Sequence, residues 1–172
     1  MLKKLISIIM ISISIIILFY NHMDINNKQE KIDNILNTKI KRKYYGYIFF
    51  PKINHKNLIS IENDSLDKNL VQMISKDEVF NNDIGNIILA GHNNKYVFSN
   101  IYKLSIGDEI IISDFKNQYS YKIYETKYIN IKDKYILDNV YDKRIVTLIT
   151  CTNNNQIRFI IRGICNHTIS HN

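Results

Sequence analysis

The sequence predicts an all-β domain, closed or sandwiched, preceded by a transmembrane helix. Two observations support this prediction. An uncharged apolar run lies at the N-terminus, and after residue 44 come short runs rich in Ile, Val, Tyr and Phe, separated by turn residues. At 172 residues the chain is long enough for one domain with its own core. We therefore expect one folded domain outside the membrane.

Residues 1–22 are predicted to span the membrane as a signal anchor. Residues 5–20 are apolar apart from three serines, and Lys3 and Lys4 precede them. As a helix, residues 2–20 reach about 28 Å, close to the thickness of a hydrocarbon core. The lysines favour the cytoplasmic side, so the rest of the chain is expected outside the cell. A cleaved signal peptide is the alternative, but the sequence has FYNHMD at the end of the run, where small residues would mark a cleavage site.

Residues 23–43 are predicted to form a partly helical stalk. The segment is polar, and Ile25, Ile32, Ile35 and Ile40 recur near helical spacing. We interpret it as a solvated spacer between the membrane and the domain. The domain is expected over residues 44–166, with a frayed tail at 167–172.

The domain's expected strands are short and separated by turn signals such as NNDIG, SIGDE and TNNNQ. They are Tyr47–Phe50, Asn86–Ala90, Glu109–Ser113, Tyr119–Ile131, Arg144–Thr150 and Ile157–Gly163. Helical spacing is found only in SLDKNLVQMISK, residues 65–76, while NKYVFSNIYKL is expected to form a turn or two. One or two short helices are therefore predicted beside the sheet.

The composition argues against several function classes. The net charge is +7, but the basic residues are dispersed among Asp and Glu, and no basic stripe with interleaved aromatics suggests a nucleic-acid partner. There is no Gly-rich phosphate loop and no Cys/His spacing suited to zinc. We expect no cofactor and no nucleic-acid binding.

Cys151 is predicted to be a free thiol at a strand end, facing Arg158. If Arg144–Thr150 and Ile157–Gly163 pair as an antiparallel hairpin, these two residues face each other across its mouth. A guanidinium there suits a tetrahedral oxyanion, or the backbone of a substrate, beside a thiolate nucleophile. Cys165 would lie toward the far end of the hairpin, beyond the roughly 7 Å that a disulfide allows between Cα atoms. We interpret Cys165 as an incidental small residue.

A thiol nucleophile needs a proton acceptor or a cationic neighbour. Of the five histidines, His22 lies at the membrane, His55 is expected to be solvated in a loop, and His167 and His171 are in the tail. His92 follows a buried-looking strand and a glycine in NIILAGHN, where a strand opens into a loop. A lone histidine is more often structural, but His92 is the candidate partner of Cys151.

These segments together resemble the sortases, membrane-anchored cysteine transpeptidases of Gram-positive bacteria. GYIFFPKI resembles an early strand of that family, and AGHNNKYVFSNIYKLSIGDEIII resembles its histidine segment. TLITC resembles its TLxTC nucleophile motif, and RFIIRG its closing arginine strand. The order and spacing of the motifs behind a signal anchor make the resemblance specific over residues 46–164.

The resemblance implies a closed sortase-type β-barrel and a role for each motif residue. It implies Cys151 as nucleophile, His92 as acid/base and Arg158 as stabiliser of the oxyanion and substrate backbone. Arg162 is the rival arginine on the same strand face, but it lies about 13 Å further along. Thr150 either orients the substrate through its hydroxyl or is an ordinary strand residue.

The resemblance also implies the substrates and partners. A surface protein with an LPxTG-like C-terminal sorting signal would be cleaved through a thioacyl enzyme. It would then be attached to an amine of a peptidoglycan precursor or of a pilin lysine. The short segment KDKYILDNVYDK, and the lack of a long lid-like segment before the barrel, favour a class A-like or class D-like enzyme. The exact sorting motif and the amine remain open.

The sequence leaves a calcium site and two alternative functions open. Some relatives bind calcium through acidic loops, for which Asp77, Glu78, Asp83 and Asp133 are candidates, although solvated carboxylates are the preferred interpretation. Another membrane-anchored cysteine hydrolase is the first alternative function. A non-catalytic β-domain for surface assembly is the second.

Overall fold

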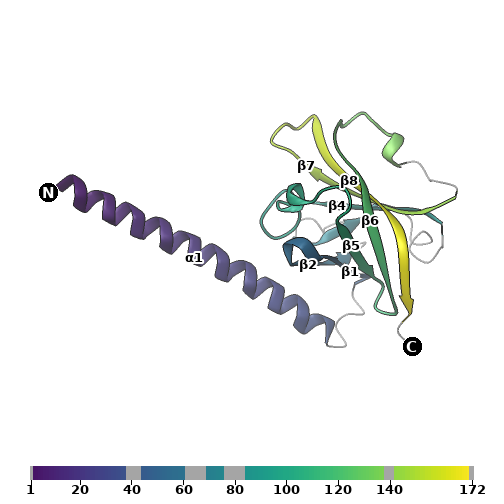
Figure 1. The fold of residues 1–172 in the computed structure, drawn as a ribbon, viewed down its shortest axis with the longest axis horizontal. Helices are drawn as coiled ribbons and strands as arrows, with labels where there is room; N and C mark the ends of the chain where they lie inside the picture. Colours follow the sequence, from purple (N-terminus) through teal and green to yellow (C-terminus); the bar gives the residue numbers. More distant parts are fainter. Residues whose placement is uncertain (1, 38–43, 61–68, 76–83, 138–141, 171–172) are drawn as a thin grey trace.

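The fold is a β-barrel carried on one long N-terminal helix (Figure 1). The structure is a computed structural model, and it describes residues 2–37, 44–60, 69–75, 84–137 and 142–170. Helix α1 is Leu2–Leu36. The described residues also form the strands β1 (Gly46–Phe50), β2 (His55–Ser60), β3 (Val71–Met73), β4 (Gly85–Gly91), β5 (Glu109–Ser113), β6 (Asn117–Asn130), β7 (Arg144–Cys151) and β8 (Ile157–Ser170).

The barrel is closed, with strand order β1-β2-β3-β4-β7-β8-β6-β5 and β5 paired back to β1. Most neighbours are antiparallel, but β2 with β3 and β4 with β7 are parallel. In the second parallel pair Gly85 is level with Arg144, and Gly91 is level with Thr150. The carboxyl ends of β4 and β7 therefore lie side by side at one end of the barrel.

Large apolar side chains fill the barrel interior. Phe50, Phe98 and Tyr121 are fully buried, and the rings of Phe50 and Phe98 meet edge to face with centroids 6.0 Å apart. Along β6, buried Tyr121 and Ile123 alternate with exposed residues, as the sequence alternation predicted. The predicted closed all-β barrel is confirmed.

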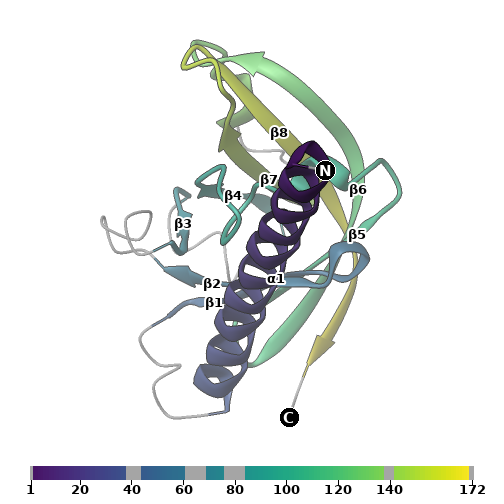
Figure 2. The same cartoon turned by 90° about the vertical axis from the view of Figure 1, so that its left-hand side faces the viewer.

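Helix α1 runs without a break through the predicted end of the anchor at residue 22. In the part of the chain that the structure describes, it is the one helix long and apolar enough to cross a membrane, and its apolar window is not buried in the protein. Figure 2 shows the C-terminal part of the helix passing beside the barrel near β1 and β2. Ile32 is buried there. The prediction of a solvated spacer is therefore wrong for this part, because the helical spacing of its isoleucines marks a packed face.

Three local predictions need correction. A helix was predicted over residues 65–76, but Val71–Met73 forms β3; residues 65–68 and 76 lie outside the described residues. Backbone pairing to β2 and β4 overrides the helical spacing there. His55 was expected to be solvated in a loop, but it begins β2 and is buried. Of the predicted frayed tail, residues 167–170 form the end of β8, paired with the start of β6.

Helix within the described part of the barrel is limited to three 3-10 turns: Pro51–Ile53, Ile101–Lys103 and Tyr135–Leu137. The turn Ile101–Lys103 falls inside NKYVFSNIYKL, where a turn or two was predicted.

Candidate active site

Cys151 and Arg158 face each other at the mouth of the hairpin formed by β7 and β8. They are Cα partners in the antiparallel ladder, and Cys151 is free and exposed. The turn between them is held by the Thr152 hydroxyl, which donates to the carbonyl oxygens of Asn154 at 3.0 Å and Ile157 at 3.2 Å. The predicted hairpin and the facing pair are confirmed.

The guanidinium of Arg158 lies against the hairpin turn. Its Nη1 donates to the carbonyl oxygens of Asn155 at 2.9 Å and Ile157 at 3.1 Å. Among the described residues, none accepts a hydrogen bond from its Nε or Nη2. Since a guanidinium carries five N–H donors, two of its nitrogens keep donors that no described residue uses.

His92 lies at the same end of the barrel as Cys151. Gly91 and Thr150, which precede them, are level in the parallel pair of β4 and β7. The Thr150 hydroxyl is buried and donates to the Gly91 carbonyl at 2.8 Å. Both His92 and Cys151 are exposed immediately beyond this bond. The topology thus brings two segments, 59 residues apart in the chain, to adjacent strand ends.

The bond between Thr150 and Gly91 bears on the role of Thr150. Its hydroxyl was considered either as a substrate contact or as part of an ordinary strand residue. In the structure the hydroxyl hydrogen is directed to the backbone of β4. Thr150 therefore ties β7, which ends at Cys151, to β4, which ends just before His92.

Arg162 is held in the barrel wall, away from the hairpin mouth. It is level with Thr147 on β7, and its Nη1 lies 3.6 Å from the carboxylate of Glu125. Its guanidinium also lies over the ring of Tyr124, at 5.7 Å from the centroid. These contacts favour Arg158 over Arg162 as the arginine beside the thiol.

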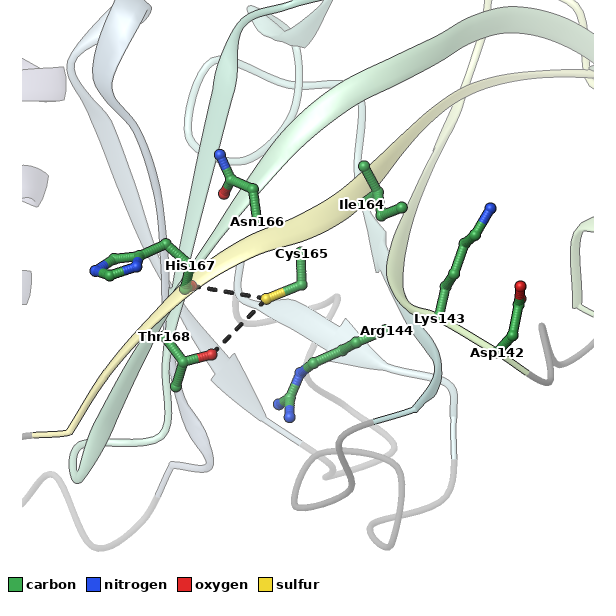
Figure 3. Close-up of a pocket in the computed structure, with 8 residues that line it drawn as sticks. All are labelled: Asp142, Lys143, Arg144, Ile164, Cys165, Asn166, His167 and Thr168. Carbon is green, nitrogen blue, oxygen red and sulfur yellow. Dashed lines mark hydrogen bonds between the residues drawn. The ribbon is translucent and has the colours of Figure 1, made fainter.

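Cys165 lies near the opposite end of the β7–β8 ladder, because its neighbour Ile164 is level with Ile145. Its Sγ is 3.7 Å from the carbonyl oxygen of His167 and 3.9 Å from the hydroxyl of Thr168 (Figure 3). A cavity of about 440 Å³ adjoins these residues. Both cysteines are free, which agrees with the prediction that they do not pair.

A tyrosine that the sequence did not single out contacts the backbone of Cys151. The hydroxyl of Tyr102 donates to the carbonyl oxygen of Cys151 at 3.0 Å. Its ring packs on Phe159 at 4.5 Å between centroids and stacks with Tyr128 at 6.5 Å. The pKa of Tyr102 is raised, first by burial and then by Tyr128 and Cys151. Only the tertiary fold brings these aromatic residues together, so no local pattern marks them.

The described residues contain no group of three or more His, Cys, Asp or Glu side chains arranged to hold a metal ion. Of the four calcium candidates, Asp77, Glu78 and Asp83 lie outside the described residues. Asp133 closes a turn by accepting the backbone N–H of Asn130 at 2.9 Å. The possibility of a calcium site therefore stays an expectation from the sequence.

Comparisons with known proteins agree on one family. A family model described as the Sortase domain matches residues 48–165. Sortase A of Listeria monocytogenes is 43% identical over 70 residues, which are 39% of this chain and 31% of that protein. Sortase A of Bacillus anthracis is 29% identical over 131 residues, which are 72% of this chain and 60% of that protein. The matched segments thus span less than two thirds of either relative.

Solved structures show the same fold. Listeria monocytogenes sortase A has a TM-score of 0.66 and 27% identity, covering 76% of this chain and 92% of that one. A Clostridium perfringens sortase C, solved with the C-terminal cell wall sorting motif, has a TM-score of 0.62 and 28% identity. That match covers 72% of this chain and 71% of the other.

The fold and the site together define a class: closed β-barrel proteins with an exposed free thiol at a strand end. The match to the Sortase domain covers more than half of the chain. The chain belongs to the sortase family, whose members are cysteine transpeptidases.

Proposed function

We propose that this protein is a membrane-anchored sortase that cleaves an LPxTG-like sorting signal and transfers the surface protein to an amine. The observation that supports this most strongly is the meeting of two parallel strand ends, β4 before His92 and β7 at Cys151, with Arg158 opposite the thiol. The Clostridium perfringens relative, solved with the C-terminal cell wall sorting motif, supports the substrate class.

In the proposed first step, the thiolate of Cys151 attacks the threonine carbonyl carbon of the signal. The carbonyl oxygen becomes an oxyanion, which the donors of Arg158 stabilise in the transition state. The amide C–N bond then breaks, and His92 gives its proton to the departing amine. A thioester between Cys151 and the surface protein results.

In the second step, the amine of a peptidoglycan precursor or pilin lysine attacks the thioester carbonyl. His92 takes the proton from this amine, and the C–S bond breaks to return the thiolate. A thioester suits this exchange, because it splits one difficult acyl transfer into two easier ones. With Lys3 and Lys4 on the cytoplasmic side, α1 would hold the barrel outside the cell.

The test is to incubate the full chain, in lipid nanodiscs, with a small library of sorting-signal peptides and to look for peptide adducts by mass spectrometry. We expect an adduct on Cys151 that Cys151→Ala abolishes, whereas the matched control Cys165→Ala retains it. His92→Gln and Arg158→Gln should slow adduct formation by about 100-fold or more. An adduct that persists in Cys151→Ala would overturn the proposal.

Adding a soluble amine distinguishes the alternatives. A transpeptidase converts the adduct into an amide with the added amine, while a cysteine hydrolase releases the free acid at the same rate with or without it. A non-catalytic assembly domain forms no adduct with any peptide.

A further inference from the structure

The anchor helix contacts the loop that carries His92. We call residues 92–100 the His92 loop. Lys95 Nζ lies 2.6 Å from the carboxylate of Asp24 on α1 and donates to the side-chain oxygen of Asn21 at 3.1 Å. The hydroxyl of Tyr96 also donates to Asp24. Two consecutive loop residues are therefore bound by side chains that follow directly after the apolar run of α1.

Lys28, one helical turn further along α1, makes the deeper contact. Its Nζ donates to the carbonyl oxygens of Tyr96 at 2.7 Å and Asn69 at 2.9 Å. Its ammonium also lies over the Tyr96 ring, 5.4 Å from the centroid. Burial lowers the pKa of Lys28 to about 8. This ammonium joins the helix to the loop and to the segment before β3.

The short backbone of the loop connects Tyr96 to His92. The carbonyl oxygen of His92 accepts N–H bonds from Asn94 at 2.9 Å and Phe98 at 3.0 Å. The side-chain oxygen of Asn94 accepts the N–H of Tyr96 at 2.9 Å. Phe98 is buried in the core. A shift of Tyr96 therefore passes to the backbone of His92 through one or two hydrogen bonds.

The contact between α1 and the barrel is polar and incompletely packed. Ile32 is the one buried apolar side chain among the described residues of α1. Cavities of about 470 Å³ and 260 Å³ lie beside the helix, the first reaching Gln29 and the second Lys28. Within the described part of the chain, the buried Gln29 Nε2 and His55 Nε2 have no hydrogen-bond partner. Because this interface buries little apolar surface, its polar contacts with the His92 loop are its main feature.

We propose that Lys28 and Asp24 of the anchor helix are positioning residues that hold the His92 loop in its productive geometry. The proposal rests on the function proposed above for His92. The apolar run and the contacts belong to one unbroken helix, so Lys28 stands only about 12 Å along the axis from Tyr20. The membrane anchor would then be part of the catalytic machinery rather than a tether.

The test compares Lys28→Met with Lys31→Met in the full chain in nanodiscs. Lys31 is exposed on the same helix and carries the same charge, so it is the matched control. We expect Lys28→Met to lower kcat for amine transfer about tenfold, with KM for the peptide within twofold of wild type. Lys31→Met should leave both within twofold. Lys28→Arg, which keeps a cationic donor, should retain most of the wild-type kcat. Asp24→Asn should also lower kcat, but by less than Lys28→Met does.

Two further readouts separate a positioning role from a stabilising one. The pH profile of Cys151 alkylation should shift in Lys28→Met but not in Lys31→Met. The imidazole NMR signal of His92, assigned with His92→Gln, should broaden or move in Lys28→Met even without substrate. An unchanged kcat, alkylation profile and His92 signal in folded Lys28→Met would overturn the proposal.

The outcome for wild type keeps the two proposals apart. If wild type forms the Cys151 adduct and Lys28→Met behaves like it, only the positioning role fails. If wild type forms no adduct with any peptide, the proposed function fails. In that case, a displaced His92 signal in Lys28→Met would show that the helix contact positions the loop. It would also show that this positioning serves no catalysis, which overturns the inference as stated.

Discussion

At the scale of single residues, the backbone around Cys151 is held by groups other than the side chains of His92, Cys151 and Arg158. Thr150 ties β7 to Gly91, Thr152 closes the turn, and Tyr102 caps the carbonyl of Cys151. Because each bond ends at a backbone atom, they restrict where the thiol can lie without touching the sulfur. Reactive groups work best when their supporting shell is rigid.

Tyr102→Phe tests this support. The substitution removes the hydroxyl that donates to Cys151 but keeps the ring on Phe159. We expect unfolding free energy to fall by about 1 kcal/mol, and the rate of peptide adduct formation to fall several-fold. Stopped-flow mass spectrometry and chemical unfolding measure the two quantities.

Tyr128→Phe is the matched control, since it removes a hydroxyl from the same aromatic cluster at an exposed position. It should change neither quantity. Equal losses in both variants would show that the aromatic surface, rather than the bond to Cys151, supports the site.

At the scale of elements, the end of β4 and the His92 loop fit together without spare room. A Cβ on Gly91 would lie 2.5 Å from Cδ2 of Phe98 and 2.7 Å from Cγ1 of Val97. Both side chains are buried. The glycine before His92 is therefore required by the close approach of the loop, which folds back over the strand end.

Gly91→Ala should displace the loop rather than fit within it. We expect a loss of about 1–3 kcal/mol in unfolding free energy, the range for overpacked cores, together with a lower rate of adduct formation. Gly107→Ala offers a contrast, because open space surrounds its Cβ position and only its positive φ of 95° opposes the change. That variant should lose stability but retain the adduct rate per folded molecule. A normal adduct rate in folded Gly91→Ala would contradict the expected displacement of the loop.

The hairpin of β7 and β8 was predictable because it is local. Six residues separate Cys151 from Arg158, and the turn signal TNNNQ fills most of that interval. The apolar runs on either side set the register, so the facing pair followed from strand geometry alone. The placement of His92 beside this hairpin depends on a parallel pairing across more than fifty residues. The strand end before His92 made it a candidate partner of Cys151, and its acid/base role was expected from the family resemblance.

At the scale of the whole molecule, a buried histidine links stability to pH. Burial first, and then the nearby positive charge of Lys28, lower the pKa of His55 to about 4. The folded state therefore binds this proton more weakly than the unfolded chain, whose His pKa is about 6.5. The stabilisation is complete above pH 6.5 and is lost as the pH falls from 6.5 to 4.

We expect the unfolding free energy to fall by about 2 kcal/mol between pH 7.5 and pH 5 through this residue. His55→Gln removes the titrating group, so its unfolding free energy should change correspondingly less over the same interval. Urea unfolding of the full chain, followed by tyrosine fluorescence, measures both slopes. Identical slopes in the two proteins would show that His55 is not protonated on unfolding.

The sequence by itself determined the apolar helix, most of the strands, the free thiol and its facing arginine. Each of these follows from periodicity or turn chemistry within about twenty residues, where the chain's own geometry leaves few choices. Tertiary structure alone decided that Val71–Met73 forms a strand, that His55 is buried, and that α1 reaches the His92 loop. These depend on neighbours brought from distant parts of the chain, whose pairing and burial override local preference.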